Sequence, residues 1–114
     1  MQITTSISGI NMENLTATER KNIPVYSGFI KYFPRAILAV ARLSKVANDQ
    51  HNPGEPLHWA KEKSQDELDA LMRHMIDDTL GESVDTDGIL HFTKIAWRGM
   101  ANLERELEKQ NDKK

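Results

Sequence analysis

The sequence contains no cysteine. This absence excludes disulfide bonds, zinc–thiolate sites and cysteine nucleophiles, and it fits a reducing compartment. Any metal ion must therefore be held by aspartate, glutamate, histidine or backbone oxygen.

Long apolar runs and an excess of one charge are also missing. No stretch approaches the roughly 18 apolar residues that a membrane-spanning helix needs, and residues 1–6 lack the basic start and apolar core of a signal peptide. Fifteen basic and seventeen acidic residues give a formal net charge of -2, so no global positive field favours a nucleic-acid backbone. We therefore expect a cytoplasmic protein with no membrane partner and no duplex nucleic-acid partner.

The 114 residues suffice for one soluble domain and exclude a two-domain enzyme. Residues 1–22 are rich in Thr, Ser and Asn and show no lasting periodicity, so we expect a weakly ordered arm there. We expect a single domain over residues 23–110, beginning with an irregular segment, and a frayed tail over residues 111–114.

Apolar residues spaced three and four apart predict three amphipathic helices, over residues 34–48, 64–80 and about 89–110. Pro34 suits the first turn of the first helix. Ser64 and Glu67 form a capping-box signature for the second helix. Its apolar stripe comprises Leu68, Leu71, Met72, Met75, Ile76 and Leu80. A long loop over residues 48–63, with two prolines and a glycine, and an Asp-rich turn over residues 81–88 separate the three helices.

This pattern predicts an all-α fold, a small helical bundle of three long helices plus a long loop. Three apolar stripes around one centre make a thin core, so we expect homo-oligomerisation to complete the bundle. Methionine and tryptophan are most simply interpreted as core or interface residues.

Two acidic patterns are candidates for a metal site. Asp66, Asp69, Arg73 and Asp77 share one helical face opposite the apolar stripe, and the paired carboxylates of Asp66 and Asp69 have a spacing that suits Mg²⁺. The alternative interpretation is a solvated helix face with an ion pair between Asp69 and Arg73. Glu82 and Asp85 repeat the spacing in the turn, which is otherwise an ordinary turn with Asp87 as a helix cap.

A basic pattern occupies the third helix. His91, Lys94 and Arg98 form one polar stripe that faces either phosphate oxygens or solvent. The four histidines match neither a His-Glu-x-x-His motif nor a close histidine pair, so the spacing predicts no zinc site. Phosphate-binding glycine loops, dinucleotide fingerprints and a serine nucleophile elbow are absent from the sequence.

Taken together, residues 48–59, the pair Arg73-His74 and the pattern Gly-Glu-x-x-Asp-x-x-Gly-x-x-His over residues 81–91 resemble the phage dATP/dGTP diphosphohydrolase-like domain. The resemblance spans roughly residues 23–108. That family looks related to the MazG-like all-α nucleotide pyrophosphohydrolases. The resemblance implies a helical, oligomeric protein of the host cytoplasm. It also implies cleavage of a purine-preferred (deoxy)nucleoside triphosphate to monophosphate and diphosphate with Mg²⁺ or Mn²⁺.

The resemblance also implies which residues form the site. MazG-like enzymes carry Glu-x-x-Glu and Glu-x-x-Asp on successive helices, and the nearest counterparts here are the metal-ligand candidates Asp66, Asp69, Glu82 and Asp85. The narrower family pattern is matched by Asn52, His58, Trp59, Arg73, His74 and His91.

Phosphoryl transfer needs positive charge on the phosphate oxygens and an oriented water. We therefore expect Asp69 or His74 to act on the water. Trp59 would stack on the base, and Asn52 would read its edge. The expected substrate-binding set is Asn52, His58, Trp59, Arg73, His91, Lys94 and Arg98.

Two other classes of function remain open from the sequence. One is a non-catalytic nucleotide-binding protein, which would keep the cationic and aromatic groups without forming product. The other is a helical homo-oligomeric interaction module, in which the acidic residues only solubilise the protein.

Overall fold

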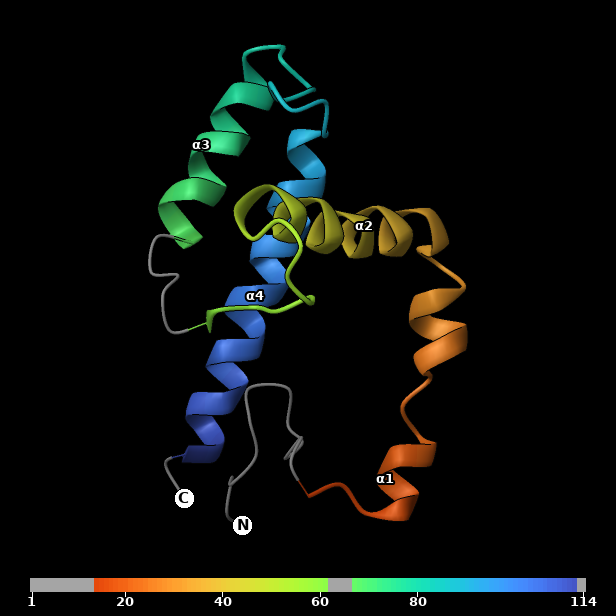
Figure 1. Cartoon of the computed structure of the whole chain (residues 1–114). Coiled ribbons are helices and arrows are strands. Elements are labelled where there is room, and N and C mark those ends of the chain that lie inside the picture. The colour runs from red at the N-terminus through yellow and green to blue at the C-terminus, as the bar shows by residue number, and fades with distance from the viewer. Residues whose placement is uncertain (1–13, 62–66, 113–114) are drawn as a thin grey trace. The chain divides into compact units, whose positions relative to one another are not determined.

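A computed structural model describes residues 14–61 and 67–112. This part of the chain is mostly helical and confirms the all-α prediction (Figure 1). Its helical elements are α1 (Ala17–Lys21), the π-helical segment η1 (Tyr26–Ile30), α2 (Pro34–His51), α3 (Glu67–Thr79) and α4 (His91–Asp112). Within these ranges no helix is long and apolar enough to cross a membrane.

The chain divides into two compact units. One unit comprises Pro34–Asn102 and therefore holds α2, α3 and the first part of α4. The other comprises Met1–Phe33 together with Leu103–Lys114. The candidate site lies in the first unit.

Helix α2 begins at Pro34, as predicted, and ends at His51, three residues later than expected. The reason is a capping arrangement around Asn48, which is buried. Its Nδ2 donates to the carbonyl of Glu55 at 3.0 Å, and its own carbonyl accepts from the backbone N–H of Asn52 at 2.7 Å. The loop after α2 therefore folds back on the last helical turn.

Helices α3 and α4 are both close to their predicted positions. The expected cap of the second helix, Ser64, lies outside the described residues, and α3 begins at Glu67. Helix α4 begins at His91 rather than near Ile89, because the Ile89 carbonyl accepts a hydrogen bond from the Asp85 N–H at 2.8 Å. That bond ties Ile89 to the loop and delays the start of the helix.

Within the unit of Pro34–Asn102, α3 lies beside the first part of α4, and α2 crosses α4 (Figure 1). Trp97 of α4 joins this crossing, since its Nε1 donates to the Ser44 hydroxyl of α2 at 2.8 Å. The Trp97 ring also meets Trp59 edge to face, with ring centroids 5.5 Å apart. Among the described residues, the buried apolar side chains are only Ala70, Ile89 and Ala101.

The apolar stripe of α3 does not face the centre of this unit, and the prediction that it does is wrong. Leu68, Met72, Ile76 and Leu80 are between 52% and 76% exposed. The side of α3 turned toward the interior carries Glu67, Ala70 and His74 instead. Charged groups on α4 explain this orientation, because they bond to the polar side of α3.

In the other unit, α1 falls inside the segment for which the sequence indicated no regular structure. A capping box forms it: the Thr16 hydroxyl accepts from the Glu19 N–H at 3.1 Å, and the Glu19 carboxylate accepts from the Thr16 N–H at 2.8 Å. The Thr-x-x-Glu spacing was the available signal for this helix.

Candidate functional site

The loop between α3 and α4 holds Asp85 in a defined place. An isolated antiparallel bridge pairs Val84 with Leu90, and the His91 N–H donates to the Ser83 carbonyl at 2.9 Å. Gly88 makes the tight return, with a φ of 83° in the left-handed region that favours glycine. The loop is therefore closed at its base by backbone hydrogen bonds.

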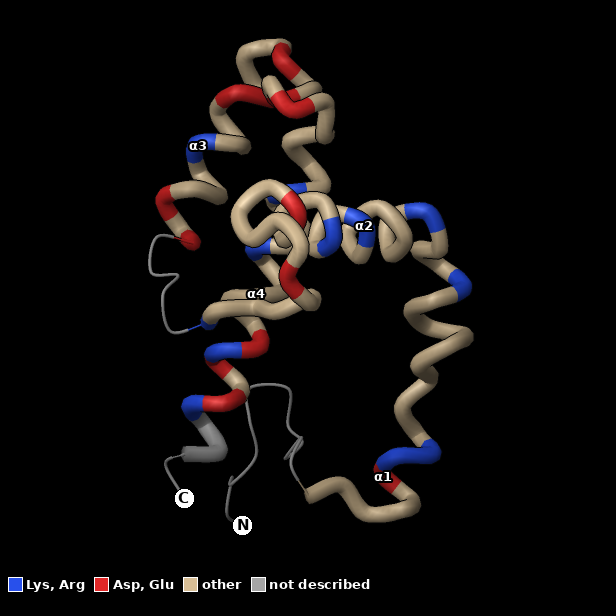
Figure 2. Tube along the Cα trace, in the orientation of Figure 1, with Lys and Arg blue, Asp and Glu red and all other residues tan. Residues whose placement is uncertain are grey.

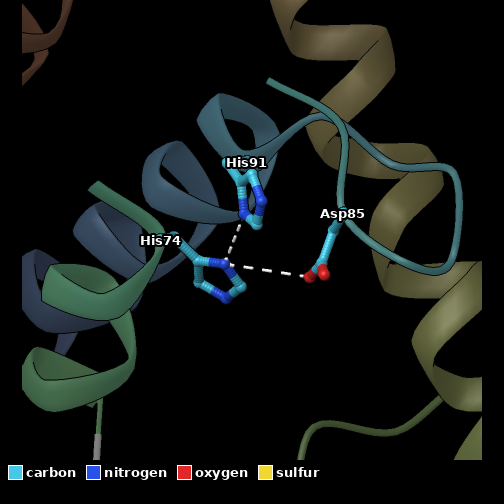
Figure 3. Close-up of side chains that lie close together, drawn as sticks. All are labelled: His74, Asp85 and His91. Atoms are coloured by element: carbon cyan, nitrogen blue, oxygen red, sulfur yellow. Dashed lines mark hydrogen bonds and ion pairs between the residues drawn. The ribbon is translucent and has the colours of Figure 1, made fainter. Parts of the chain in front are cut away.

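Three side chains from three elements converge beside this loop (Figure 3). His74 comes from α3, Asp85 from the loop and His91 from the first position of α4. The two Nδ1 atoms of the histidines are 2.9 Å apart, and His74 Nδ1 lies 3.9 Å from Asp85 Oδ2. His91 is only 2% exposed. We call these three residues the His–Asp–His cluster.

Lys94 of α4 binds the loop next to the cluster. Its Nζ lies 2.7 Å from Asp85 Oδ2 and 2.7 Å from Asp87 Oδ2. The hydrogen bond from Lys94, followed by one from the Thr86 N–H, lowers the pKa of Asp85 to about 2. The Lys94 hydrogen bond also lowers the pKa of Asp87. Burial alone would lower the pKa of Lys94, but its bonds to both carboxylates outweigh burial and raise it.

His74 has the opposite electrostatic tendency. Burial, and next the positive charge of Lys94, lower the pKa of its imidazole. Because the ordinary value is already 6.5, His74 is mostly neutral at pH 7. A neutral imidazole offers one ring nitrogen with a lone pair, the state that binds a metal ion or accepts a proton.

Two further carboxylates flank the cluster. Glu67, at the start of α3, accepts from Arg98 Nη1 at 2.9 Å, and its side chain is 2% exposed. Asp77 Oδ2 lies 3.9 Å from His91 Nε2. The polar stripe of α4 therefore contacts carboxylates. Acidic residues gather along the loop that joins α3 to α4 (Figure 2).

The structure brings together four of the predicted site residues and separates others from them. His74, Asp85, His91 and Lys94 meet at the cluster. Asp69 and Glu82 are exposed, and neither belongs to a metal-compatible group within the described part of the chain. Asp66 lies outside the described residues. Arg73 is exposed on α3, and Arg98 is bonded to Glu67.

The predicted base-binding residues lie on the loop after α2. Asn52 and His58 are exposed there. Trp59 is half-buried, with its ring against Trp97 and Lys61 Nζ 5.1 Å from its centroid. These contacts already cover part of the surface that would stack on a base.

Sequence reasoning did not assign Glu67, Asp77 or Asp87 to the site. Glu67 and Asp77 share the helical face of His74, at positions separated by seven and three residues, so helical periodicity could have grouped them. Asp87 was interpreted only as a cap, whereas its Oδ1 accepts from the Ile89 N–H at 3.1 Å and its Oδ2 binds Lys94.

Fold and site together define a small all-α protein with a partly buried histidine–carboxylate cluster formed by α3, α4 and the loop that joins them. The family model for the dATP/dGTP diphosphohydrolase N-terminal domain matches residues 16–114. The chain therefore belongs to the dATP/dGTP diphosphohydrolase N-terminal domain family. No curated protein and no solved structure gives a match.

Proposed function

We propose that this protein hydrolyses dATP or dGTP to the deoxynucleoside monophosphate and diphosphate, in a reaction that requires Mg²⁺ or Mn²⁺. The family to which the chain belongs supports the class of substrate. The observation that carries the proposal is the convergence of His74, Asp85 and His91 within a domain of that family. Groups of this kind, brought together from separate elements, are typical of metal-assisted hydrolysis.

Hydrolysis of a phosphoric anhydride requires stabilisation of the charge on the phosphate oxygens. When bound, a divalent cation supplies that positive charge. Asp85 offers the oxygen donor that both Mg²⁺ and Mn²⁺ accept, and the imidazoles of His74 and His91 add nitrogen donors. The cluster therefore has the donor atoms to hold the cation at the triphosphate.

The surrounding charges have supporting roles in this proposal. Lys94 keeps Asp85 ionised and fixes the position of its Oδ2. The Asp77 carboxylate lies 3.9 Å from His91 Nε2 and adds negative charge beside the cluster. Arg98 is engaged by Glu67, so we assign it to holding α3 against α4 rather than to the phosphates.

Product analysis tests the proposal. The purified protein would be incubated with each canonical nucleoside and deoxynucleoside triphosphate in the presence of Mg²⁺, Mn²⁺ or EDTA, and the products separated by ion-exchange chromatography. We expect metal-dependent monophosphate and diphosphate from dATP or dGTP. Release of nucleoside and triphosphate would show that the protein cleaves a different bond. A nucleotide-induced rise in Tm without product would instead support a non-catalytic binding protein.

The exposed stripe on α3 favours a second proposal, that two copies of this chain associate through α3. The few buried apolar side chains of the described residues make a small core, and the stripe offers an exposed apolar face. Homodimer interfaces are more apolar than other surfaces, and a face that packs on its own copy closes the assembly. Light scattering after gel filtration should report a dimer or larger species. A monomer would instead indicate that another part of the same chain packs on the stripe.

A further inference from the structure

We infer that His74, Asp85 and His91 form a binding site for one divalent first-row transition-metal ion and select such an ion over Mg²⁺. The inference rests on the proposed function for the role of the metal, and it deepens that function by naming the class of metal. The geometry of the three side chains, the charge around them and the chemistry of their donor atoms carry it.

The spacing of the two imidazoles is the first observation. Their Nδ1 atoms are 2.9 Å apart, so the two nitrogens cannot both carry a hydrogen. Two lone pairs at this distance would repel each other unless a positive centre, either a proton or a metal ion, lies next to both. His91 Nε2 faces Asp77, which favours the hydrogen on Nε2 and leaves the lone pair on Nδ1. The His91 lone pair is therefore directed toward His74.

Asp85 provides the third donor. Its Oδ2 lies 3.9 Å from His74 Nδ1, and the donor atoms of the three residues all lie within 4.8 Å of one another. Lys94 also donates to this oxygen. A carboxylate oxygen has two acceptor positions, so the Lys94 bond orients Asp85 and leaves one position for a metal ion. The opposite oxygen of Asp85 accepts from the Thr86 N–H at 2.7 Å, which fixes the carboxylate plane.

The charge balance around the cluster favours a cation. The carboxylates of Glu67, Asp77, Asp85 and Asp87 lie within bonding or ion-pairing distance of the cluster histidines, Lys94 or Arg98. These four carboxylates outnumber the two cationic side chains, Lys94 and Arg98. A divalent cation compensates the difference, whereas a phosphate group without a metal would be repelled.

The donor set decides which cation fits. Mg²⁺ takes oxygen ligands almost exclusively and keeps several waters, whereas imidazole is a good ligand for Fe²⁺, Ni²⁺ and Zn²⁺. Two imidazoles and one carboxylate match the transition metals. Three protein ligands also leave coordination positions for phosphate oxygens or water. The histidines that the sequence spacing left unpaired therefore become a pair in the fold.

Metal binding without nucleotide tests this inference. Tag-free full-length protein, stripped with EDTA, would be titrated with Mn²⁺, Zn²⁺ and Mg²⁺ by calorimetry and equilibrium dialysis. We expect one Mn²⁺ or Zn²⁺ per chain, bound at least about tenfold more tightly than Mg²⁺. His74→Gln should weaken binding at least about tenfold, as removal of a metal ligand requires. The matched control is His51→Gln, which removes an exposed imidazole at the end of α2 and should bind like the wild type.

A spectroscopic readout complements the titration. Co²⁺ added to the stripped protein should give a visible absorption spectrum of nitrogen and oxygen ligation, and Asp85→Asn should change it. Circular dichroism shows whether each variant is folded. His74→Gln and Asp85→Asn remove ligands from different elements, so the inference can still be tested if one of them does not fold.

Three results would overturn the metal site: no saturable Mn²⁺ or Zn²⁺ binding, equal affinity for Mg²⁺, or full binding in His74→Gln. Failure of the proposed function has a different signature. If the protein binds the metal ion but hydrolyses no triphosphate, the metal site stands and the proposed enzymatic function is refuted. If hydrolysis with Mg²⁺ is as fast in His74→Gln as in the wild type, the metal site is refuted and the proposed enzymatic function stands.

Discussion

Replacing Arg98 by methionine tests the most buried ion pair that the structure describes at this site. Methionine keeps the length and apolar stem of the side chain and removes the guanidinium. Arg98 Nη1 lies 2.9 Å from a Glu67 carboxylate whose side chain is 2% exposed, while Arg98 itself is 28% exposed. Breaking a buried pair from one side typically costs about 3–5 kcal/mol, and the partial exposure of Arg98 places this case near about 3 kcal/mol. For a chain of this size, that corresponds to a fall in Tm of roughly 10 °C.

Urea unfolding followed by circular dichroism measures the loss. Lys45→Met is the matched control, because it breaks the exposed Lys45–Asp49 pair, whose side chains are 70% and 52% exposed. That change should cost about 0.5 kcal/mol. Adding Glu67→Gln to Arg98→Met should recover about 1 kcal/mol or more, since the buried charge is removed. If Arg98→Met is as mild as Lys45→Met, then Arg98 is not held by Glu67 and remains available to bind substrate.

Three further changes have defined outcomes. Gly88→Ala should cost about 1–2 kcal/mol in urea unfolding, because its φ of 83° strains any residue with a Cβ, whereas Gly99→Ala, inside α4 with open space around it, should cost nothing. The folded-state pKa of Asp85 is about 2, below its ordinary value of 3.8. This carboxylate therefore adds stability that is complete above pH 3.8 and disappears as the pH falls toward 2. Lys94→Met removes the responsible hydrogen bond, so urea unfolding of the metal-free variant should depend less on pH across this window; an unchanged dependence would contradict the assignment. Met72→Glu places a charge in the exposed stripe of α3 and should shift the protein toward monomer in light scattering; an unchanged oligomer would move the interface elsewhere.

Helical periodicity and turn chemistry predicted the elements well. The three long helices followed from apolar spacing, and Pro34 marked the start of α2. The end of α2 was less predictable, because it depends on a hydrogen bond from Asn48 to Glu55, seven residues away. The start of α4 depends likewise on the bond between Asp85 and Ile89. Local patterns therefore predicted the three long helices. They missed α1 and η1, which lie where a weakly ordered arm and an irregular segment were expected. Contacts outside those patterns determined where two of the long helices end or begin.

The site was predictable only in part. His74, Asp85, His91 and Lys94 were all candidates, but 17 positions separate the histidines and no spacing rule places them 2.9 Å apart. The orientation of α3 was misjudged for a related reason. The apolar stripe suggested burial within one chain, whereas ion pairs such as Glu67–Arg98 turn the polar face inward. Pairing between helices, which one sequence does not reveal, decided both points.

The central claim is that the His–Asp–His cluster is where dATP or dGTP is hydrolysed. Its most direct test is the turnover of Asp85→Asn beside that of wild type and of Asp49→Asn, an exposed carboxylate on α2, with folding verified for each. We predict a loss of at least about 100-fold for Asp85→Asn, as expected when charge stabilisation at the transition state is removed, and wild-type turnover for Asp49→Asn. Full turnover in folded Asp85→Asn, with loss on Asp69→Asn instead, would contradict the account and place the reaction on the exposed face of α3.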